Sequence, residues 1–305
     1  VPEPLPEPIN ASTRYCAVYG HPVRHSASPA MQNAGIAALG LNWRYLAFEV
    51  HADDLRPALE GAKQMRFAGI NLTVPHKLLA LDMMDALDES ARTWGAVNTV
   101  RFEAKDTHGA WRPLREFADS PREVRAHGFN TDADAITRSL REDLGVEVAG
   151  AKVLLLGAGG AGRTAALKLA ADGAAGLFLV NRTRSKAEAV AREINQRWPG
   201  ANVTVGYPSG AVDLVLNATS LGLRADDPLP WDDAAFSLRQ APAVYDMIYR
   251  PAETPLLKAA RAAGCRAANG LGMLLYQGAR ALELWSGQAA PIETMRRALE
   301  KNVYG

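Results

Sequence analysis

A glycine-rich turn that follows a strongly apolar segment is the feature that most constrains this chain. Val153–Leu156 are four consecutive apolar residues, which is the pattern of a strand buried on both faces of a parallel sheet. The sequence G-A-G-G-A-G follows at residues 157–162, and residues 163–170 are good helix formers. A strand, a glycine turn and a helix in this order are typical of a dinucleotide-binding site, whose helix N-terminus holds the phosphates. A purely structural glycine turn is the alternative interpretation.

The glycines of this turn have separate expected purposes. Gly157 permits a tight turn, Gly159 lets the backbone approach a pyrophosphate, and Gly162 lets the helix pack closely on the strand. A second loop, at residues 218–222, follows another apolar strand and contains Thr219. Ligands of open α/β sheets collect at such strand ends, so Thr219 is a candidate cofactor contact.

The residues after the next strand favour NADP over NAD. An NAD site usually carries Asp or Glu about 20 residues after the glycines, where it holds the ribose 2′-hydroxyl. This chain has Asn181 there, followed by Arg182, Arg184 and Lys186. A guanidinium can hold a 2′-phosphate through two parallel hydrogen bonds, whereas a carboxylate would repel it. A solvated, basic helix start is the alternative.

Composition places the chain in an ordinary class. A chain of 305 residues that is 48% hydrophobic and 22% charged is long for one core and suits two globular domains. The net charge of +1 predicts no nucleic-acid or membrane-surface partner, and no apolar run approaches the roughly 20 residues of a membrane span. We expect a cytoplasmic protein without a signal peptide, with two buried free thiols and no metal site. A monomer and a homodimer both remain open.

Alternating strands and helices predict an α/β fold with a parallel, doubly wound first half. The proline-rich residues 1–13 are expected to form a disordered tail. Strands are expected near residues 15–20, 43–50, 68–74 and 95–101, one helix over residues 78–93, and a hairpin or surface insertion at residues 105–126. The domains expected are residues 14–131 together with the C-terminal helices of residues 271–305, which bind substrate, and residues 132–270, which form a Rossmann domain.

Polar residues follow the strands of the first half in three places. Ser26 and Ser28 lie in a loop, Thr73 and Lys77 follow a strand, and Asn98 and Asp132 lie in later turns. Such groups suit a polyhydroxylated substrate, and a lysine beside a carboxylate can supply a proton when a ketone is reduced. Ser28 and Asp132 as helix N-caps, and Lys77 as an ordinary surface lysine, are the alternatives.

These stretches resemble the shikimate dehydrogenase family. The matching segments occur in the family's order from about Tyr15 to the end of the chain. They are G-H-P-V-R-H-S-A-S-P (20–29), N-L-T-V-P-H-K (71–77), G-A-V-N-T (95–99), N-T-D (130–132), G-A-G-G-A-G (157–162), N-R-T (181–183), N-A-T-S-L-G (217–222), D-M-I-Y (246–249) and G-L-G-M-L-L-Y-Q (270–277).

The resemblance implies reversible, NADPH-dependent reduction of 3-dehydroshikimate to shikimate, a step of chorismate and aromatic amino-acid formation. Lys77 matches the catalytic lysine and Asp132 its partner. Ser26 and Ser28 match the residues that hold the substrate carboxylate, and the ring contacts match Asn71, Thr73, Asn98, Tyr249 and Gln277. The cofactor positions that match are Gly157, Ala158, Gly159, Gly160 and Ala161 at the pyrophosphate, Asn181, Arg182 and Thr183 at the 2′-phosphate, and Met247 and Gly270 beside the nicotinamide.

Two departures from the family pattern keep alternatives open. Lys186 replaces the second arginine of the 2′-phosphate loop, and Arg184 is an additional cation. The segment of residues 104–126 is longer than the family pattern suggests. The alternatives are a quinate/shikimate dehydrogenase with relaxed cofactor use, a non-catalytic ligand sensor, and another two-domain NADP enzyme such as a methylenetetrahydrofolate dehydrogenase.

Overall fold

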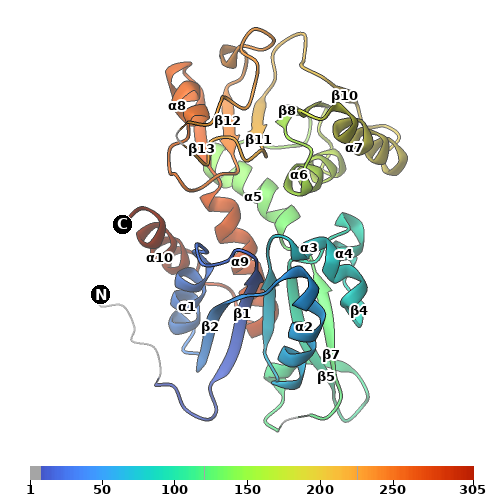
Figure 1. Ribbon diagram of the computed structural model, residues 1–305, viewed down its shortest axis with the longest axis vertical. Coiled ribbons are helices and arrows are strands. Elements are labelled where there is room, and N and C mark those ends of the chain that lie inside the picture. The colour runs from blue at the N-terminus through green and yellow to red at the C-terminus, as the bar shows by residue number, and fades with distance from the viewer. Residues whose placement is uncertain (1–7, 120, 225) are drawn as a thin grey trace. The chain divides into compact units, whose positions relative to one another are not determined.

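The computed structural model describes residues 8–119, 121–224 and 226–305, and the chain divides into two compact units. The first unit comprises the chain up to Thr131 together with Leu275–Val303 and Gly305, and the second comprises Asp132–Leu274 and Tyr304. Each unit has its own sheet, and the predicted α/β class is confirmed (Figure 1). Within the described ranges, no helix is both long and apolar enough to cross a membrane.

The sheet of the first unit has the order β2-β1-β3-β5-β7-β4, and β6 pairs with β5. Its strands are β1 (Arg14–Gly20), β2 (Trp43–Glu49), β3 (Gly69–Leu72), β4 (Ala86–Leu87), β5 (Thr99–Lys105), β6 (Trp111–Pro113) and β7 (Val124–Phe129). Strand β1 is parallel to β2 and β3, but β5 is antiparallel to β3 and β7. The sheet is therefore mixed, not parallel throughout as predicted. The connection from β5 to β6 is a short hairpin, and a parallel pair would require a crossover.

Helices cover both faces of this sheet (Figure 1). On one face, Leu55 and Leu59 of α2 (Leu55–Gln64) join a core cluster with Ile70 of β3. On the other face, Trp285 of α9 (Leu271–Ser286) donates a hydrogen bond of 3.0 Å to the Val100 carbonyl. A side chain on Gly69 would overlap this indole, because its Cβ would lie 1.9 Å from Trp285 Nε1. The other helices of the first unit are α1 (Ser28–Ala38), α3 (His76–Leu79), α4 (Glu89–Trp94) and α10 (Ile292–Tyr304).

The predicted helix over residues 78–93 is wrong. Helix α3 passes into a 3₁₀ turn (Ala80–Met83), the short strand β4 pairs with β7, and α4 begins afterwards. Asp85 accepts a hydrogen bond of 2.7 Å from the backbone N–H of Ala126, and Asp88 caps α4 by accepting from the N–H of Ser90. These carboxylates satisfy backbone groups where the helix is interrupted, which a periodicity argument does not detect.

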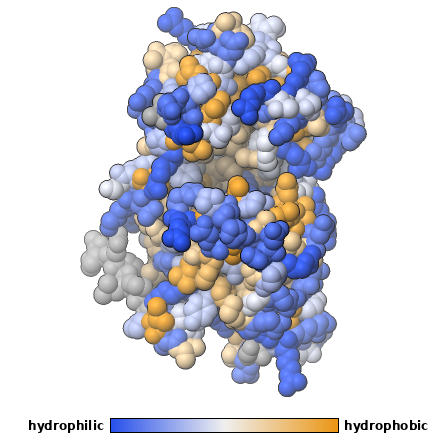
Figure 2. Space-filling model, viewed as in Figure 1, coloured by the Kyte–Doolittle hydropathy of each residue, from blue (hydrophilic) through white to orange (hydrophobic). Residues whose placement is uncertain are grey.

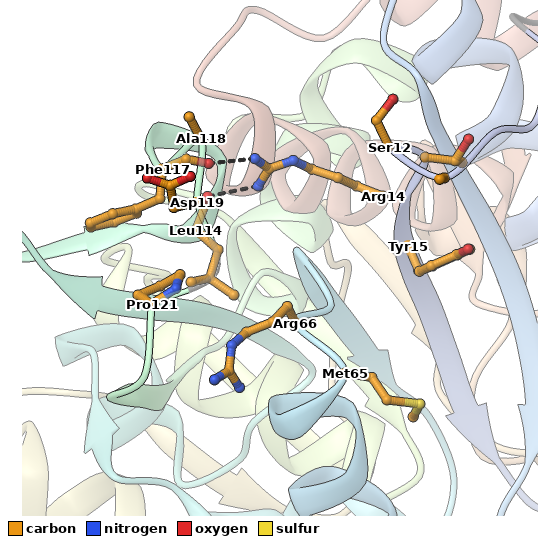
Figure 3. A pocket seen from close by; sticks show the side chains of 12 residues that line it. Ser12, Arg14, Tyr15, Met65, Arg66, Leu114, Phe117, Ala118, Asp119 and Pro121 are labelled. Carbon is orange, nitrogen blue, oxygen red and sulfur yellow. Dashed lines mark hydrogen bonds between the residues drawn. The ribbon is translucent and has the colours of Figure 1, made fainter.

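The expected insertion at residues 105–126 contains the predicted hairpin, formed by β5 and β6. Arg14 ties the next part of this segment to β1, since its guanidinium donates hydrogen bonds of 2.7 Å to the carbonyls of Leu114 and Phe117 (Figure 3). A pocket of about 250 Å³ opens beside this contact and is also lined by Tyr15 and Arg66. None of the predicted site residues lines this pocket.

Part of the predicted tail, residues 1–7, lies outside the described residues. Asn10 and Thr13 at its end form a hydrogen-bonded turn, and the hydroxyl of Thr13 donates to Asn42 Oδ1 at 2.8 Å. On the surface drawn in Figure 2, hydrophilic residues dominate and apolar side chains are scattered among them.

The second unit has a wholly parallel sheet in the order β10-β9-β8-β11-β12-β13, which is the Rossmann order. Its strands are β8 (Lys152–Leu156), β9 (Gly176–Val180), β10 (Val203–Val205), β11 (Leu214–Asn217), β12 (Ala243–Asp246) and β13 (Arg266–Asn269). Its helices are α5 (Asp132–Leu144), α6 (Gly160–Ala171), α7 (Arg184–Arg197) and α8 (Pro255–Ala262). The strand order reverses between β8 and β11, so ligands are expected at the carboxyl ends of these two strands.

Candidate active site

The predicted substrate residues of the first unit are brought to one edge of its sheet. The loop of Ser26 follows β1, and Thr73 and Lys77 follow β3. Asn98 precedes β5, but β5 is antiparallel to β3, so its beginning lies at the same edge as the end of β3. The reversed strand thus places Asn98 near Asn71, and the register pairs Asn71 directly with Thr99.

A chain of buried side-chain hydrogen bonds connects these residues. Asn71 Nδ2 donates to Thr99 Oγ1 at 3.0 Å and to the Asn98 carbonyl at 3.3 Å. Asn98 Nδ2 donates to Thr131 Oγ1 at 2.9 Å, and Asn98 Oδ1 accepts from the N–H of Thr131 at 2.7 Å. Because a backbone carbonyl only accepts, these bonds determine which way the Asn71 amide points.

Thr99 and Thr131 fall within the recognised motifs, but no role was predicted for either. Tyr45 of β2 was not predicted at all, although its hydroxyl donates to Asn71 Oδ1 at 2.8 Å. Only its place on a strand that neighbours β1 could have indicated Tyr45, and that signal is weak.

Lys77 lies in the short helix α3, at a backbone position held from two sides. Its carbonyl accepts a hydrogen bond of 2.8 Å from the N–H of Val97. The preceding His76 is buried, and its Nε2 lies 2.9 Å from the Val50 carbonyl, so this nitrogen carries the proton. Burial lowers the pKa of His76, which keeps the ring neutral. The side chain of Lys77 is partly exposed.

The end of β1 lies close to the residue that follows β3, because a Cβ on Gly20 would lie 2.4 Å from Thr73 Cγ2. Ser28 is buried and is the first residue of α1, and its N–H donates to Ser26 Oγ at 3.3 Å. The N-cap residue is Ala27, so the interpretation of Ser28 as the N-cap is wrong.

Two further predicted substrate residues lie on helices. Asp132 is buried and begins α5 in the second unit, and Gln277 is a partly exposed residue of α9 in the first unit. Lys77 belongs to the first unit.

The glycine turn of the second unit has the expected geometry. Gly157 has a φ of 103°, which favours glycine, and a Cβ there would lie 2.9 Å from the Ala218 carbonyl oxygen. A Cβ on Gly162 would lie 2.1 Å from the Gly157 carbonyl, which confirms the predicted close packing. Gly159 and Gly160 have open space where a Cβ would lie. Gly159 is the N-cap residue of α6 without a side-chain cap, so the first N–H groups of the helix suit a pyrophosphate.

Asn181 connects the glycine turn to the basic loop. Its Oδ1 accepts a hydrogen bond of 2.9 Å from the N–H of Ala158, and its Nδ2 donates to the Thr183 carbonyl at 2.8 Å. A carboxylate could replace only the first of these bonds, and it would face the Thr183 carbonyl without a hydrogen to donate. Asparagine therefore has a structural purpose at this position.

The three cations of the basic loop differ in their partners. Arg184 donates through Nε to Glu188 Oε1 at 2.9 Å, one helical turn away. Arg182 and Lys186 are exposed, and neither forms an ion pair with any described residue. Arg182 and Lys186 therefore have charged groups available for a phosphate, as has the exposed Thr183 its hydroxyl.

A buried carboxylate organises the loops after β11 and β12. Asp246 accepts hydrogen bonds from Thr254 Oγ1 at 2.6 Å, Asn217 Nδ2 at 2.9 Å and the N–H of Ile248 at 3.1 Å. Asn217 Oδ1 in turn accepts from Thr219 Oγ1 at 2.8 Å. Burial raises the pKa of Asp246, and these donors oppose that effect. The network was not predicted, although its residues fall within the recognised motifs.

Met247 and Gly270 meet at the ends of β12 and β13. A Cβ on Gly270 would lie 2.0 Å from the Met247 carbonyl oxygen, so only glycine fits there. Tyr249 follows in the same loop, is partly exposed, and has its pKa raised by burial. Contacts within the second unit therefore bring residues 157–161 together with Asn181 and Thr219. Other contacts bring Met247 together with Gly270.

Comparison with known proteins places these features in one family. Three family models match the chain: the substrate binding domain of shikimate dehydrogenase at residues 18–100, shikimate/quinate 5-dehydrogenase at residues 139–205, and the C-terminal domain of shikimate 5′-dehydrogenase at residues 270–300. A shikimate dehydrogenase (NADP(+)) of Moorella thermoacetica is 43% identical over 305 residues, which cover 96% of this chain and 95% of the relative. The chain belongs to the shikimate dehydrogenase family.

Solved structures of the family and of its neighbours share the fold. A shikimate dehydrogenase in complex with NADP+ has a TM-score of 0.82 at 33% identity and covers 99% of this chain and 100% of its own. The ligand-free 5-ketofructose reductase of a Gluconobacter strain has a TM-score of 0.80 at 34% identity and covers 96% of this chain and 99% of its own. The fold thus also occurs in an enzyme named for a different substrate. The matched shikimate dehydrogenase substrate domain includes the predicted residues Ser26, Ser28, Asn71, Thr73, Lys77 and Asn98.

Proposed function

We propose that this protein is an NADP-dependent shikimate dehydrogenase that reversibly reduces 3-dehydroshikimate to shikimate. The first unit binds the substrate and the second binds NADP. One observation carries the proposal: the serine loop, the Asn71–Asn98 network and the turn with Lys77 lie at a single edge of the first sheet. Relatives with the printed name shikimate dehydrogenase (NADP(+)) support it.

The residues that bind the substrate contact different parts of it. The hydroxyls of Ser26 and Ser28 hold the carboxylate, and Asn71, Thr73 and Asn98 bind ring hydroxyls. Tyr249 and Gln277 complete the ring contacts. Both amide hydrogens of Asn71 are already donated to groups of the protein, so only its oxygen can accept a hydrogen bond from a ligand hydroxyl.

The cofactor residues fit NADP. The open positions at Gly159 and Gly160 and the uncapped start of α6 suit a pyrophosphate held by residues 157–161. Arg182, Thr183 and Lys186 suit a 2′-phosphate, while Asn181 holds their loop against the turn. Met247 and Gly270 border the nicotinamide, and Thr219 is a further cofactor contact.

Proton transfer is assigned to Lys77. NADPH, when bound, supplies a hydride to the ring ketone. Lys77 gives the developing alkoxide its proton in the reduction and takes that proton back in the oxidation, with Asp132 as its partner. The hydrogen bonds at His76 and Val97 keep the backbone of Lys77 in place while its side chain reaches the substrate.

The experiment that tests this proposal is an absorbance assay at the nicotinamide band. Shikimate and quinate are each combined with NADP and with NAD, and 5-ketofructose is tested with NADPH. We expect fast reduction of NADP with shikimate alone. Comparable rates with NAD or quinate would assign the relaxed quinate/shikimate class, and turnover of 5-ketofructose alone would overturn the proposal. Ligand binding without turnover in any arm would indicate a sensor.

A cytoplasmic location and the absence of nucleic-acid partners stay predictions that rest on composition and charge. A monomer and a homodimer both stay open.

A further inference from the structure

Tyr45 is a buried tyrosine whose hydroxyl the proposed mechanism does not use. Its side chain is fully buried in β2, and its ring lies 6.1 Å from that of Trp285. Buried hydroxyls need partners, and this one donates to Asn71 Oδ1 at 2.8 Å.

The direction of these hydrogen bonds follows from the backbone. The Asn98 carbonyl can only accept, so the amide nitrogen of Asn71 faces it and the amide oxygen faces Tyr45. The tyrosine therefore donates to Asn71.

We infer that Tyr45 is a positioning residue that holds Asn71 Oδ1 in place for recognition of a ring hydroxyl, together with the bonds of the amide nitrogen. This inference rests on the proposed function. With Tyr45 in place, Asn71 Oδ1 keeps one lone pair for a donor from the substrate. Without the tyrosine hydroxyl, this oxygen loses its own hydrogen bond inside the protein, and only the bonds of the amide nitrogen to Thr99 and Asn98 still hold the amide.

Tyr45→Phe tests the inference, because it removes one oxygen and keeps the ring against Trp285. We expect the KM for shikimate to rise about ten-fold, the expected size for one lost orienting hydrogen bond, with the KM for NADP within two-fold of the parent. Tyr19→Phe is the matched control. Tyr19 lies on β1 and is also buried, but its hydroxyl has no hydrogen-bond partner among the described residues, so all constants should stay unchanged.

A double-mutant cycle shows whether the effect passes through Asn71. In an Asn71→Ala background, Tyr45→Phe should change the KM for shikimate by less than two-fold. An equal rise in both backgrounds, or a KM within two-fold of the parent in the single variant, would overturn the inference. A lower unfolding midpoint with unchanged KM would indicate a merely structural tyrosine. The parent's turnover of shikimate tests the proposed function separately.

Discussion

Side-chain amides determine much of the geometry at the residue scale. In the first unit, the Asn71 side chain donates a hydrogen bond to the Asn98 carbonyl, and the Asn98 side chain donates to Thr131. In the second unit, Asn181 joins the glycine turn to the basic loop. An amide both donates and accepts, so it can satisfy a donor and an acceptor at the same time. Aspartate would fail at each position for want of a donor.

Lys77→Ala tests the assignment of the proton-transfer group. We expect kcat to fall by about 10²- to 10⁴-fold, the usual contribution of a positioned acid or base. Shikimate and NADP should still bind, because the backbone of α3 is held by His76 and the Val97 N–H. Steady-state kinetics and equilibrium titration check both expectations. Near-normal turnover would remove Lys77 from the mechanism.

Lys186→Ala and Arg184→Ala form a matched pair for cofactor choice. Arg184 is held by Glu188, whereas Lys186 has no ion pair among the described residues. We expect Lys186→Ala to raise the KM for NADP about ten-fold, because a charge-assisted hydrogen bond contributes roughly 1.5–3 kcal/mol. Arg184→Ala should change it less than two-fold. The KM for NAD serves as the control, and a larger effect from Arg184→Ala would reverse the assignment.

At the element scale, helix α1 covers part of the edge strand β2. The side chain of Asn33 on α1 accepts from the N–H of Tyr45 at 2.9 Å and donates to its carbonyl at 2.8 Å. These backbone groups lie on the unpaired side of the edge strand, where they would otherwise attract another strand. The Asn33 side chain of α1 therefore satisfies these backbone groups, so that they are not available to another strand.

Asn33→Ala should destabilise the first unit and expose this edge. Loss of the two bonds is expected to cost about 1–3 kcal/mol of unfolding free energy. Chemical denaturation measures the loss, and size-exclusion chromatography detects association through the edge. Gln64→Ala, which removes an exposed amide from α2, is the control and should change neither. An unchanged variant would show that water replaces Asn33 without cost.

A buried carboxylate joins β5 to β7. Burial by itself would raise the pKa of Glu103, but hydrogen bonds from His127, Arg101 and Arg125 outweigh it and lower the pKa to about 2. Arg125 Nη2 lies 2.7 Å and His127 Nδ1 3.1 Å from the carboxylate, which is 1% exposed. The folded protein therefore prefers the ionised form more strongly than the unfolded chain does.

The stabilising effect of Glu103 should depend on pH in one direction. It is present above the ordinary glutamate pKa and is lost as the pH falls toward about 2. Glu103→Gln should lower the unfolding free energy at pH 7 by on the order of 3 kcal/mol, and the difference from the parent should shrink near pH 3. Glu123→Gln, at an exposed ion pair with Lys105, is the control. A pH-independent difference would attribute the loss to packing.

At the scale of the whole molecule, two units with separate cores should respond differently to ligands. Helix α9 begins in the second unit and continues into the first, where Trp285 enters the core. The cofactor residues all belong to the second unit. Binding of NADP should therefore stabilise that unit first.

Thermal unfolding with cofactor measures this effect. NADP at 100 times its Kd should add about 2.7 kcal/mol to the unfolding free energy of the unit that binds it, and NAD at the same concentration should add less. Arg182→Ala should reduce the NADP effect and leave that of NAD unchanged. Equal stabilisation by both cofactors in the parent would show that the 2′-phosphate is not recognised.

The local pattern of the chain determined the elements whose signal is local. The apolar run before Gly157, the glycine spacing and the alternation of strands and helices predicted a Rossmann unit, and the structure has it. The interruption of the predicted helix at residues 78–93 was not predicted. Asp85 accepts from the backbone N–H of the distant Ala126, and Asp88 accepts from the N–H of Ser90, and the periodicity of apolar residues does not reveal such bonds.

Only the tertiary structure decided which distant residues meet. The reversed direction of β5 places Asn98 beside Asn71, and the pairing of β1 with both β2 and β3 brings Tyr45 within reach of the same amide. Strand direction and order depend on the packing of whole elements, so residues far apart in sequence leave no local mark of their contact. The residue types of the site were readable in the sequence, but the hydrogen bonds that orient them were not.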